Sequence, residues 1–563
     1  MQKQDTMRRN ECRHHSASPE KVFLIIGTLS GILFLLITPP FQVPDEPRHF
    51  FRAFHVSEFC LLAQKLDLEK APDAMFLVRE DGRFIRYKAQ EGGNSPAYRH
   101  VRDAVPVDVA ERVMHFVRRT LETGTQQIFR FELHMNNEMH RYVARVIQSG
   151  NDEALVSVTD STSVTEKVGA FLPKSLIITV NGVMGNVPFH PEEKQNIHEI
   201  FSLLKLPLDP AERSFAEFPN TALYSPLPYI PQASGIALGR IFNFSPLVLV
   251  YLGRIFNLSV WILLVYLAIH TTPVSKWLFF LSALMPMSLF QAASLSADCV
   301  TNGVSFLLIS LFLRYSFGET ESIRVADILV LLLCSLFLPL CKQVYFPLLF
   351  LFLLIPATKF GTKRNYWITF VLICLMSGAT SVLWSSLAKG IYVPFPGRPA
   401  VPDQQIRFIA ADPLHYFTVI ARTFIHYGRE YAEEFIGVLG CLDTKLPGIL
   451  IASYLTVLTL AAIADNREDI RIGSKEKLLM VVVFLLSAVL ISTSLYLLWT
   501  EVGRNIIEGI QGRYFIPIAP LLFLLFYNRK IHFYFRRFDL AILCHTLSVL
   551  TCTLGVLLKR YYL

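Results

Sequence analysis

Long apolar runs separated by polar stretches dominate the pattern of this chain. A helix rises about 1.5 Å per residue, so about 20 apolar residues cross a bilayer. The first run is Val22–Thr38, and the others lie beyond residue 245. The pattern predicts a mainly α, polytopic helical membrane protein with about 11 spans, several of them short. The later spans are expected at about Pro246–Ile269, Trp277–Ser294, Cys299–Phe317, Val325–Leu340, Val344–Ala357, Tyr366–Leu387, Gly448–Ala464, Leu478–Leu498, Tyr514–Tyr527 and Leu540–Leu558.

Two polar stretches are too long to be simple connections. The first, Phe41–Ser245, has about 205 residues, which is enough for a domain. The second, residues 390–447, contains the amphipathic run DPLHYFTVIARTFIHYGREYAEEFIGVLG. That run predicts a helix that either lies in the membrane interface or packs on the first long loop.

Within the first loop, composition changes near Asp67 and again near Val168. DAMFLVREDGRFIRYKA predicts two strands around an Asp81-Gly82 turn. VPVDVAERVMHFVRRTLETG predicts an amphipathic helix that ends at Gly124, and TQQIFRFELHMNNEMHRYVARVIQSGNDEALVSVTD predicts three strands. This order, with the closing VTDSTSVTEK, resembles a PAS sensor domain. The expected parts are a tail (1–21), a first span with an acidic motif (22–66), the PAS-like domain (67–168), the rest of the loop (169–245) and a polytopic membrane domain (246–563).

Lys and Arg are concentrated in every second connection between the predicted spans. This bias marks cytoplasmic loops, so it places the N-terminus in the cytoplasm and both long loops outside. The last span is an exception, because Lys559 and Arg560 then fall outside. The first apolar run is followed by Pro39 and Pro40 rather than by a small-residue cleavage site, which predicts an uncleaved span.

Composition agrees with a membrane protein, since 52% of the residues are hydrophobic, 17% are charged and the mean hydropathy is +0.41. The net charge of +8 follows from basic cytoplasmic loops, and no basic run with interleaved aromatics suggests nucleic-acid binding. The nine cysteines have no metal-ligand spacing and are expected to pack as small apolar residues. His49 and His55 also lack a partner at such a spacing, so we expect them at the surface.

Ionisable residues gather at the outer ends of the predicted spans. TPPFQVPDEPRHFFRAF places two adjacent carboxylates, Asp45 and Glu46, between Pro44 and Pro47 directly after the first span. The prolines restrict the backbone around both acids, which favours a functional site over a solvated turn. Charges at membrane depth cost about 2.5–3.5 kcal/mol each and usually face a cavity or each other. Further polar residues predicted at this face are Arg254, Asp298, Lys342, Asp443, Glu501, Gln511 and Arg513.

Several of these residues also have a structural interpretation. Arg254 can extend its charge to the outer interface. Asp298 can cap the N-terminus of the span that follows it. Lys342 and Arg513 can pair with carboxylates.

Carboxylates and cations together at an outer membrane face suit glycosyl transfer from a lipid-phosphate sugar. A carboxylate takes the proton of an acceptor hydroxyl while the hydroxyl oxygen attacks the anomeric carbon. Cations hold the leaving phosphate, ideally Arg through its planar fork of donors. Nucleotide sugars are made in the cytoplasm, so a polyprenyl-phosphate-linked sugar is the expected donor outside it.

Five stretches carry a resemblance that covers most of the chain. PPFQVPDEPRHFFRAF, ASLSADCVTNG, LCKQVYFPLLFLFLLIP, FIGVLGCLDTKLP and IQGRYFIPIAPLLFLL occur in that order. Over residues 22–66 and 169–526 they resemble a bacterial family of uncharacterised multi-pass membrane proteins related to GT-C glycosyltransferases. GT-C enzymes place an acidic motif in the first outer loop, as catalytic base or metal ligand. The resemblance therefore implies that role for Asp45 and Glu46, with a divalent metal ion as an optional cofactor there.

The resemblance also implies an inverting glycosyltransferase of the bacterial cytoplasmic (inner) membrane. Its expected partners are a polyprenyl-phosphate-linked sugar, a glycan or lipid-linked acceptor of the cell envelope, and membrane lipid, but no nucleic acid. The implied donor-binding residues are Lys342, Arg513 and Arg254, and the implied further polar ligands are Asp298, Asp443 and Gln511.

Two other functions would use the same features. A transporter or flippase for lipid-linked glycans would use the charges to steer a pyrophosphate without making a bond. The long outer loops and the lack of a detectable internal repeat weigh against it. A membrane sensor would use the PAS-like domain as its working part, but no kinase, cyclase or helical signalling segment follows that domain.

Overall fold

The computed structural model describes residues 18–67, 74–86, 99–103, 106–135, 138–160, 166–394, 400–465, 467, 469–529 and 537–563. Most of the predicted tail, and part of the VTDSTSVTEK segment, lie outside the described residues. The described chain is mainly helical and divides into two compact units. The membrane unit comprises Met1–Gln64 and Val168–Leu563, and the inserted unit comprises Lys65–Lys167.

Six helices among the described residues are long and apolar enough to cross a membrane. They are α2 (Pro19–Ile37), α9 (Pro246–Thr271), α12 (Asp298–Phe317), α14 (Lys363–Ala388), α18 (Ser474–Leu498) and α20 (Phe538–Tyr561). The other predicted spans form shorter or interrupted helices, so length and composition support six candidate spans and leave the predicted count of eleven unconfirmed. These are α10 (Lys276–Leu284) with α11 (Pro286–Ala292), α13 (Val325–Cys341), η4 (Gln343–Leu354), α17 (Gly448–Ala464), and η7 (Gly512–Ile518) with α19 (Ala519–Leu524).

Prolines interrupt the apolar runs of the membrane unit. Pro286 begins α11 directly after α10, and Pro339 and Pro347 lie within α13 and η4. Proline has no N–H to donate and its ring clashes with the preceding turn, so a regular helix is weakened or ends there. The interruptions leave Asp298 at the start of α12 and Lys342 between α13 and η4. Irregular backbone at membrane depth is tolerated where it lines a cavity, so these breaks mark where a site can form.

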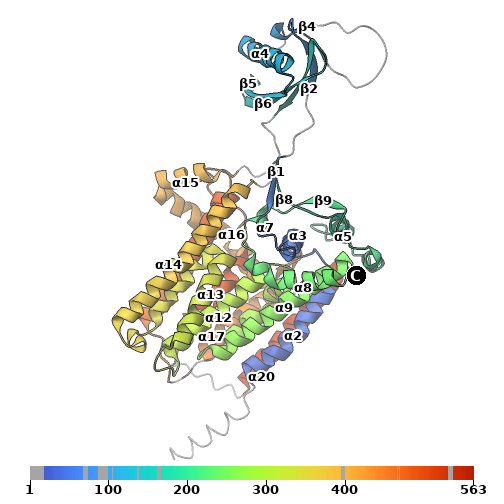
Figure 1. The fold of residues 1–563 in the computed structure, drawn as a ribbon. Helices are drawn as coiled ribbons and strands as arrows, with labels where there is room; N and C mark the ends of the chain where they lie inside the picture. Colours follow the sequence, from blue (N-terminus) through green and yellow to red (C-terminus); the bar gives the residue numbers. More distant parts are fainter. Residues whose placement is uncertain are drawn as a thin grey trace, which may run out of the picture. The chain divides into compact units, whose positions relative to one another are not determined.

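The spans pack around a large apolar core. α2 lies against α9 and α20, and α12 lies against α9 and α13 (Figure 1). Phe23 of α2 meets Trp261 of α9 edge to face, with ring centroids 5.7 Å apart, and both side chains are fully buried. Such pairs add about 0.5–1.5 kcal/mol beyond burial. The packing of α2 on α9 therefore fixes the point from which the acidic turn starts.

The first long loop folds into short helices and a small sheet. Its elements are α3 (Glu46–Ser57), β1 (Gln64–Asp67), β8 (Glu166–Pro173), α5 (Lys174–Met184), α6 (Ile197–Ser202), η2 (Leu203–Lys205), β9 (Arg213–Glu217), α7 (Pro219–Ala222), η3 (Leu227–Tyr229) and α8 (Ile230–Ile241). The strand order is β1-β8-β9, and β8 pairs antiparallel with β9. Because α3 packs on α8 and α8 packs on α9, the helix after the acidic pair is fixed to the second span.

The second long loop contains the predicted amphipathic helix, which forms as α16 (Pro413–Gly437). The Asp412 side chain accepts the backbone N–H of His415 and so caps the helix. α16 packs on α11, α17 and η7, and its contact with the membrane interface stays a prediction. The remaining short elements between residues 357 and 445 are η5 (Ala357–Phe360), η6 (Lys389–Ile391), α15 (Pro402–Ala411), β10 (Val438–Leu439) and β11 (Thr444–Lys445).

The inserted unit is an antiparallel sheet with one main helix. Its strands are β2 (Ala74–Arg79), β3 (Arg83–Arg86), β4 (Arg99–His100), β5 (Gln127–Met135), β6 (Glu138–Gln148) and β7 (Glu153–Asp160), and its helices are η1 (Val101–Asp103) and α4 (Val107–Thr123). The strand order is β4-β3-β2-β7-β6-β5. The predicted hairpin at Gly82, the helix ending at Gly124 and the three later strands are confirmed. Both glycines have positive φ, which costs glycine little.

Arg560, which departs from the charge pattern, joins the end of α20 to segments of the two long loops. Its guanidinium pairs with Asp443 at 2.9 Å and donates to the carbonyls of Val187 and Glu193. Asp443 also accepts the backbone N–H of Phe189. The Arg560 charge is therefore engaged locally by a carboxylate and two carbonyls.

A fully buried ion pair joins the acidic turn to the membrane helices. The Glu46 carboxylate accepts Arg254 Nε at 2.8 Å and Arg254 Nη2 at 2.7 Å, and neither side chain is exposed. Glu46 also accepts the backbone N–H of Phe41 and of Leu295. Arg254 donates further to carbonyls at the end of α2, within residues 35–39. The pair therefore holds the acidic turn, α9 and the link between α11 and α12 together.

Removing one partner of this pair leaves an unpaired buried charge. We predict that Arg254→Met lowers the unfolding free energy by about 3–5 kcal/mol, measured as a lower Tm of the purified protein in detergent. The double variant Glu46→Gln, Arg254→Gln is expected to cost less than the two single variants together, because no charge stays buried. Arg429→Met is the matched control, since its side chain is 89% exposed. A wild-type Tm for Arg254→Met contradicts this account.

Candidate functional site

A cavity of about 920 Å³ opens where the helix interruptions meet the first long loop. Its wall includes the start of α3, residues 219–225, the first residue of α12, the junction of α13 with η4, and the turn before η7. The volume is typical of small-molecule sites, which span about 300–1,000 Å³. Five residues predicted from the sequence line this cavity, namely Asp45, Asp298, Lys342, Gln511 and Arg513.

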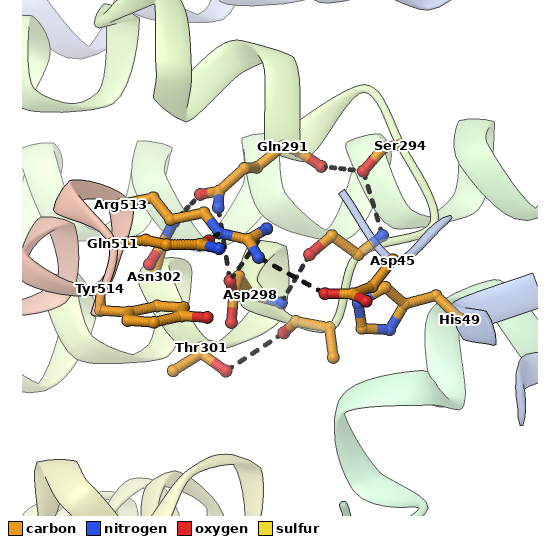
Figure 2. A network of polar contacts seen from close by, with 12 residues as sticks. Asp45, His49, Gln291, Ser294, Asp298, Thr301, Asn302, Gln511, Arg513 and Tyr514 are labelled. Atoms are coloured by element: carbon orange, nitrogen blue, oxygen red, sulfur yellow. Dashed lines mark hydrogen bonds and ion pairs between the residues drawn. The ribbon is translucent and has the colours of Figure 1, made fainter. Parts of the chain in front are cut away.

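Arg513 lies between two carboxylates of the cavity wall (Figure 2). Its Nη2 is 3.7 Å from Asp45 Oδ2, its Nη1 is 3.8 Å from Asp298 Oδ2, and its Nε donates to Gln511 Oε1 at 2.6 Å. Both carboxylate distances exceed a hydrogen bond. Arg513 Nη1 is buried and has no hydrogen-bond partner among the described residues. The guanidinium therefore has donor capacity left for an anion that enters the cavity.

Lys342 supplies a second cation to the same wall. Its Nζ donates to Asp298 Oδ1 at 3.0 Å and lies 4.3 Å from the centroid of the Tyr514 ring. The guanidinium carbon of Arg513 lies 5.3 Å from that ring centroid. The structural pairing that the sequence left open is thus observed for Lys342 with Asp298. Two cations therefore lie around one aromatic ring at this wall, beside the carboxylates of Asp45 and Asp298.

Asp298 faces the cavity rather than capping its own helix. It is the first residue of α12, yet no side-chain cap is formed there. Besides Lys342, it accepts Gln291 Nε2 at 3.3 Å, and Gln291 Oε1 accepts Asn302 Nδ2 at 3.2 Å. This buried amide chain holds the carboxylate toward Lys342 and Arg513.

Gly512 explains how the turn carrying Arg513 reaches the site. A Cβ at this position would lie 2.0 Å from the carbonyl oxygen of Tyr431 and 2.5 Å from the nitrogen of Phe435, both in α16. The Gly512 N–H donates to Glu434 Oε2 at 2.6 Å. Glycine is therefore required by close approach of two backbones, which gives a physical reason for the sequence Gln511-Gly512-Arg513.

Asp45 has an unusual backbone. Its φ of 62° is left-handed, a conformation that non-glycine residues adopt rarely and that is common at functional sites. Although it occupies the N-cap position of α3, its side chain forms no cap. Instead Oδ1 accepts Asn220 Nδ2 at 2.8 Å and lies 3.3 Å from Arg48 Nη1. The side chain is one-third exposed, so the carboxylate is held in place and remains accessible from the cavity.

The expectation of surface histidines is wrong for His49 and His55. His49 is 6% exposed and lines the cavity, and His55 is 3% exposed beside Arg52. Burial lowers the pKa of His49 to about 4, and the carboxylate of Asp45 opposes this shift only in part. The spacing from Asp45 could have identified His49 as a site residue. Positions i and i+4 share a helix face, and His49 follows Asp45 by one turn.

Three predicted site residues lie away from this cavity. Glu46 and Arg254 bind each other in the buried pair described above, and Asp443 binds Arg560. None of the three is part of the cavity wall. The adjacent acids Asp45 and Glu46 therefore point to different surroundings, one to the cavity and one to the core.

Tyrosines that sequence reasoning did not identify line part of the cavity. Tyr224 and Tyr514 line the cavity, and burial raises the pKa of Tyr224 to about 12 against the opposing charge of Lys342. Tyr229 is fully buried and bonds His49. These side chains come from segments far apart in the chain, and no local pattern in the sequence marks them.

A divalent metal held jointly by Asp45 and Glu46 does not fit this geometry. Both Glu46 oxygens already bind Arg254, and Asp45 faces Arg513 and Asn220 instead. No group of three or more His, Cys, Asp or Glu side chains suited to a metal ion occurs within the described ranges.

Comparison with known proteins gives a family but no activity. The sequence matches the model of the family "Predicted membrane protein (DUF2142)" over residues 115–522, well over half of the chain. This range includes Asp298, Lys342 and Arg513 and begins after Asp45. No curated protein and no solved structure matches the chain. The chain therefore belongs to the DUF2142 family of predicted membrane proteins.

Proposed function

We propose that this protein is a GT-C-type membrane glycosyltransferase. It moves a sugar from a polyprenyl-phosphate donor to a cell-envelope glycan or lipid-linked acceptor at the outer face of the bacterial inner membrane. The observation that carries the proposal is the buried Arg513, whose Nη1 has no hydrogen-bond partner among the described residues and whose Nη2 lies 3.7 Å from Asp45 Oδ2. A phosphate supplies the missing acceptor, and Arg binds phosphate through two parallel bonds.

The proposed reaction uses one carboxylate and two cations of the cavity. Asp45 takes the proton of the acceptor hydroxyl. The oxygen of that hydroxyl bonds to the anomeric carbon, on the face opposite the phosphate. The bond between the anomeric carbon and the phosphate oxygen breaks, which inverts the configuration. Arg513 and Lys342 stabilise the charge that develops on the leaving polyprenyl phosphate. Asp298 holds Lys342 in place through the 3.0 Å bond.

An apolar cavity next to the site supports a lipid-linked donor. It measures about 430 Å³ and is lined by residues of α16, α17, α18 and η7–α19. Phe515 and Ala519 line it, whereas Arg513 and Tyr514, in the same turn, line the polar cavity. One turn thus meets both a charged and an apolar space, as the phosphate and chain of one lipid require.

We also propose that the inserted unit is a PAS-like accessory domain, and that the N-terminus is cytoplasmic. The five-stranded core β3-β2-β7-β6-β5, with α4 packed on one face, supports the first proposal. The concentration of Lys and Arg in every second predicted connection supports the cytoplasmic N-terminus. Replacing residues 74–160 by a short Gly-Ser linker is expected to leave the glycan product in place. Loss of that product, with the shortened protein still inserted, contradicts an accessory role.

The carboxylate that we assign as the base is Asp45. In a gene deletion complemented with Asp45→Asn, we predict normal insertion but a product rate about 10²–10⁴-fold below wild type. Mass spectrometry of envelope glycans and lipid-linked sugars measures it, with the donor expected to accumulate. Asp209→Asn, an exposed acid of the same loop, is the control. Normal product from Asp45→Asn excludes Asp45 as the base.

Arg513 is expected to set phosphate affinity. We predict that Arg513→Gln weakens binding of a polyprenyl phosphate to the protein in nanodiscs by about 10–100-fold, because charge-assisted hydrogen bonds contribute about 1.5–3 kcal/mol. Arg504→Gln is the matched control, since Arg504 is half exposed and pairs with Glu501. Equal affinity for Arg513→Gln and wild type, measured by native mass spectrometry, removes the main support for the proposal.

A further inference from the structure

A histidine that the proposed reaction does not use lines the same cavity. His49 lies one turn after Asp45 in α3, and Figure 2 shows its ring beside the Asp45 carboxylate. Its Nδ1 is 2.8 Å from the hydroxyl of Tyr229, whose side chain is fully buried. Nε2 makes no hydrogen bond to the part of the chain that the structure describes. One ring nitrogen is thus engaged with the protein and the other is left for the cavity.

The Tyr229 contact determines which nitrogen carries the proton. Tyr229 has no other hydrogen-bond partner within the described residues. If Nδ1 donated to Tyr229, the buried hydroxyl proton would have no acceptor, and unmade bonds are costly in buried sites. Tyr229 therefore donates to Nδ1, and neutral His49 carries its proton on Nε2.

The surroundings keep this ring neutral. The charged groups that act on it are Asp45 and Glu46 of its own segment and Asp298 and Arg513 from other elements. Burial has the largest effect and disfavours the imidazolium form. A neutral ring with a proton on Nε2 is a hydrogen-bond donor that adds no charge beside Asp45.

We infer that His49, protonated at Nε2, donates a hydrogen bond to a hydroxyl of the carbohydrate held beside Asp45. The inference rests on the proposed function, and it assigns the substrate group that this wall recognises. A neutral donor suits a sugar hydroxyl and does not compete with Arg513 for the phosphate. Tyr229 is then a positioning residue that acts through His49.

The tautomer can be measured without any substrate. Solid-state NMR of ¹⁵N-histidine-labelled protein in liposomes, with His49→Gln used to assign the signal, is expected to show a proton on Nε2 and none on Nδ1. Tyr229→Phe is expected to give a mixture of the two tautomers. A proton on Nδ1 in the wild-type protein overturns the inference, whatever the protein's activity.

The substrate contact needs a second measurement. Membranes of the deletion strain carrying each variant at matched level, with their endogenous polyprenyl-phosphate-linked sugars as donor, report the product rate. We expect His49→Asn to lower the product rate about 10-fold. His49→Gln is expected to lower it less, because the amide nitrogen of Gln can reach the Nε2 position. Tyr229→Phe is expected to lower the rate in the wild-type background and to have little effect in the His49→Gln background.

The outcomes separate this inference from the proposed function. Wild-type rates for His49→Asn, with Asp45→Asn inactive, overturn the role of His49 and leave the transferase in place. Equal losses for His49→Gln and His49→Asn, with wild-type Tm values, also overturn it, because they show no use of a donor at Nε2. Full rates for Asp45→Asn and His49→Asn together reject both the proposed function and the role of His49.

Discussion

The buried Glu46–Arg254 pair is the interaction on which the rest of the site depends. Both side chains are withdrawn completely from solvent, and every oxygen of the carboxylate is bonded. Burying two charges is expensive, and such pairs are tolerated when they are fully hydrogen-bonded. Here the pair joins the turn after α2, α9 and the link before α12, so it fixes both Asp45 and Asp298 relative to the spans.

Because of this constraint, the two adjacent acids have different surroundings and roles. Glu46 turns into the core, and the left-handed backbone at Asp45 turns the neighbouring carboxylate into the cavity. Pro44 and Pro47 restrict the backbone on either side. The close approach of Gly512 to α16 brings Arg513 beside Asp45. The site is thus assembled from interruptions of helices, where polar backbone and charged side chains can share a water-accessible space.

The sequence predicts the class of the protein, the first and longest spans, and the elements of the inserted unit, because periodicity and turn residues are local signals. It also identifies Asp45, Asp298, Lys342, Gln511 and Arg513 as polar residues at one face, and these residues do meet in one cavity. It could not separate Glu46 from Asp45, since only the packing of α9 shows that Arg254 reaches Glu46. The buried state of His49 likewise depends on Tyr229, about 180 residues later in the chain.

The most direct test of the proposed transferase activity is a reaction with purified protein in liposomes. The donor would be the lipid-linked sugars extracted from a gene-deletion strain, with that strain's envelope glycan as acceptor, and mass spectrometry would follow every species. The account predicts that the polyprenyl-phosphate-linked sugar disappears while the glycosylated acceptor and free polyprenyl phosphate appear in equal amounts. Unchanged donor, or donor that only moves from one leaflet to the other, would contradict it.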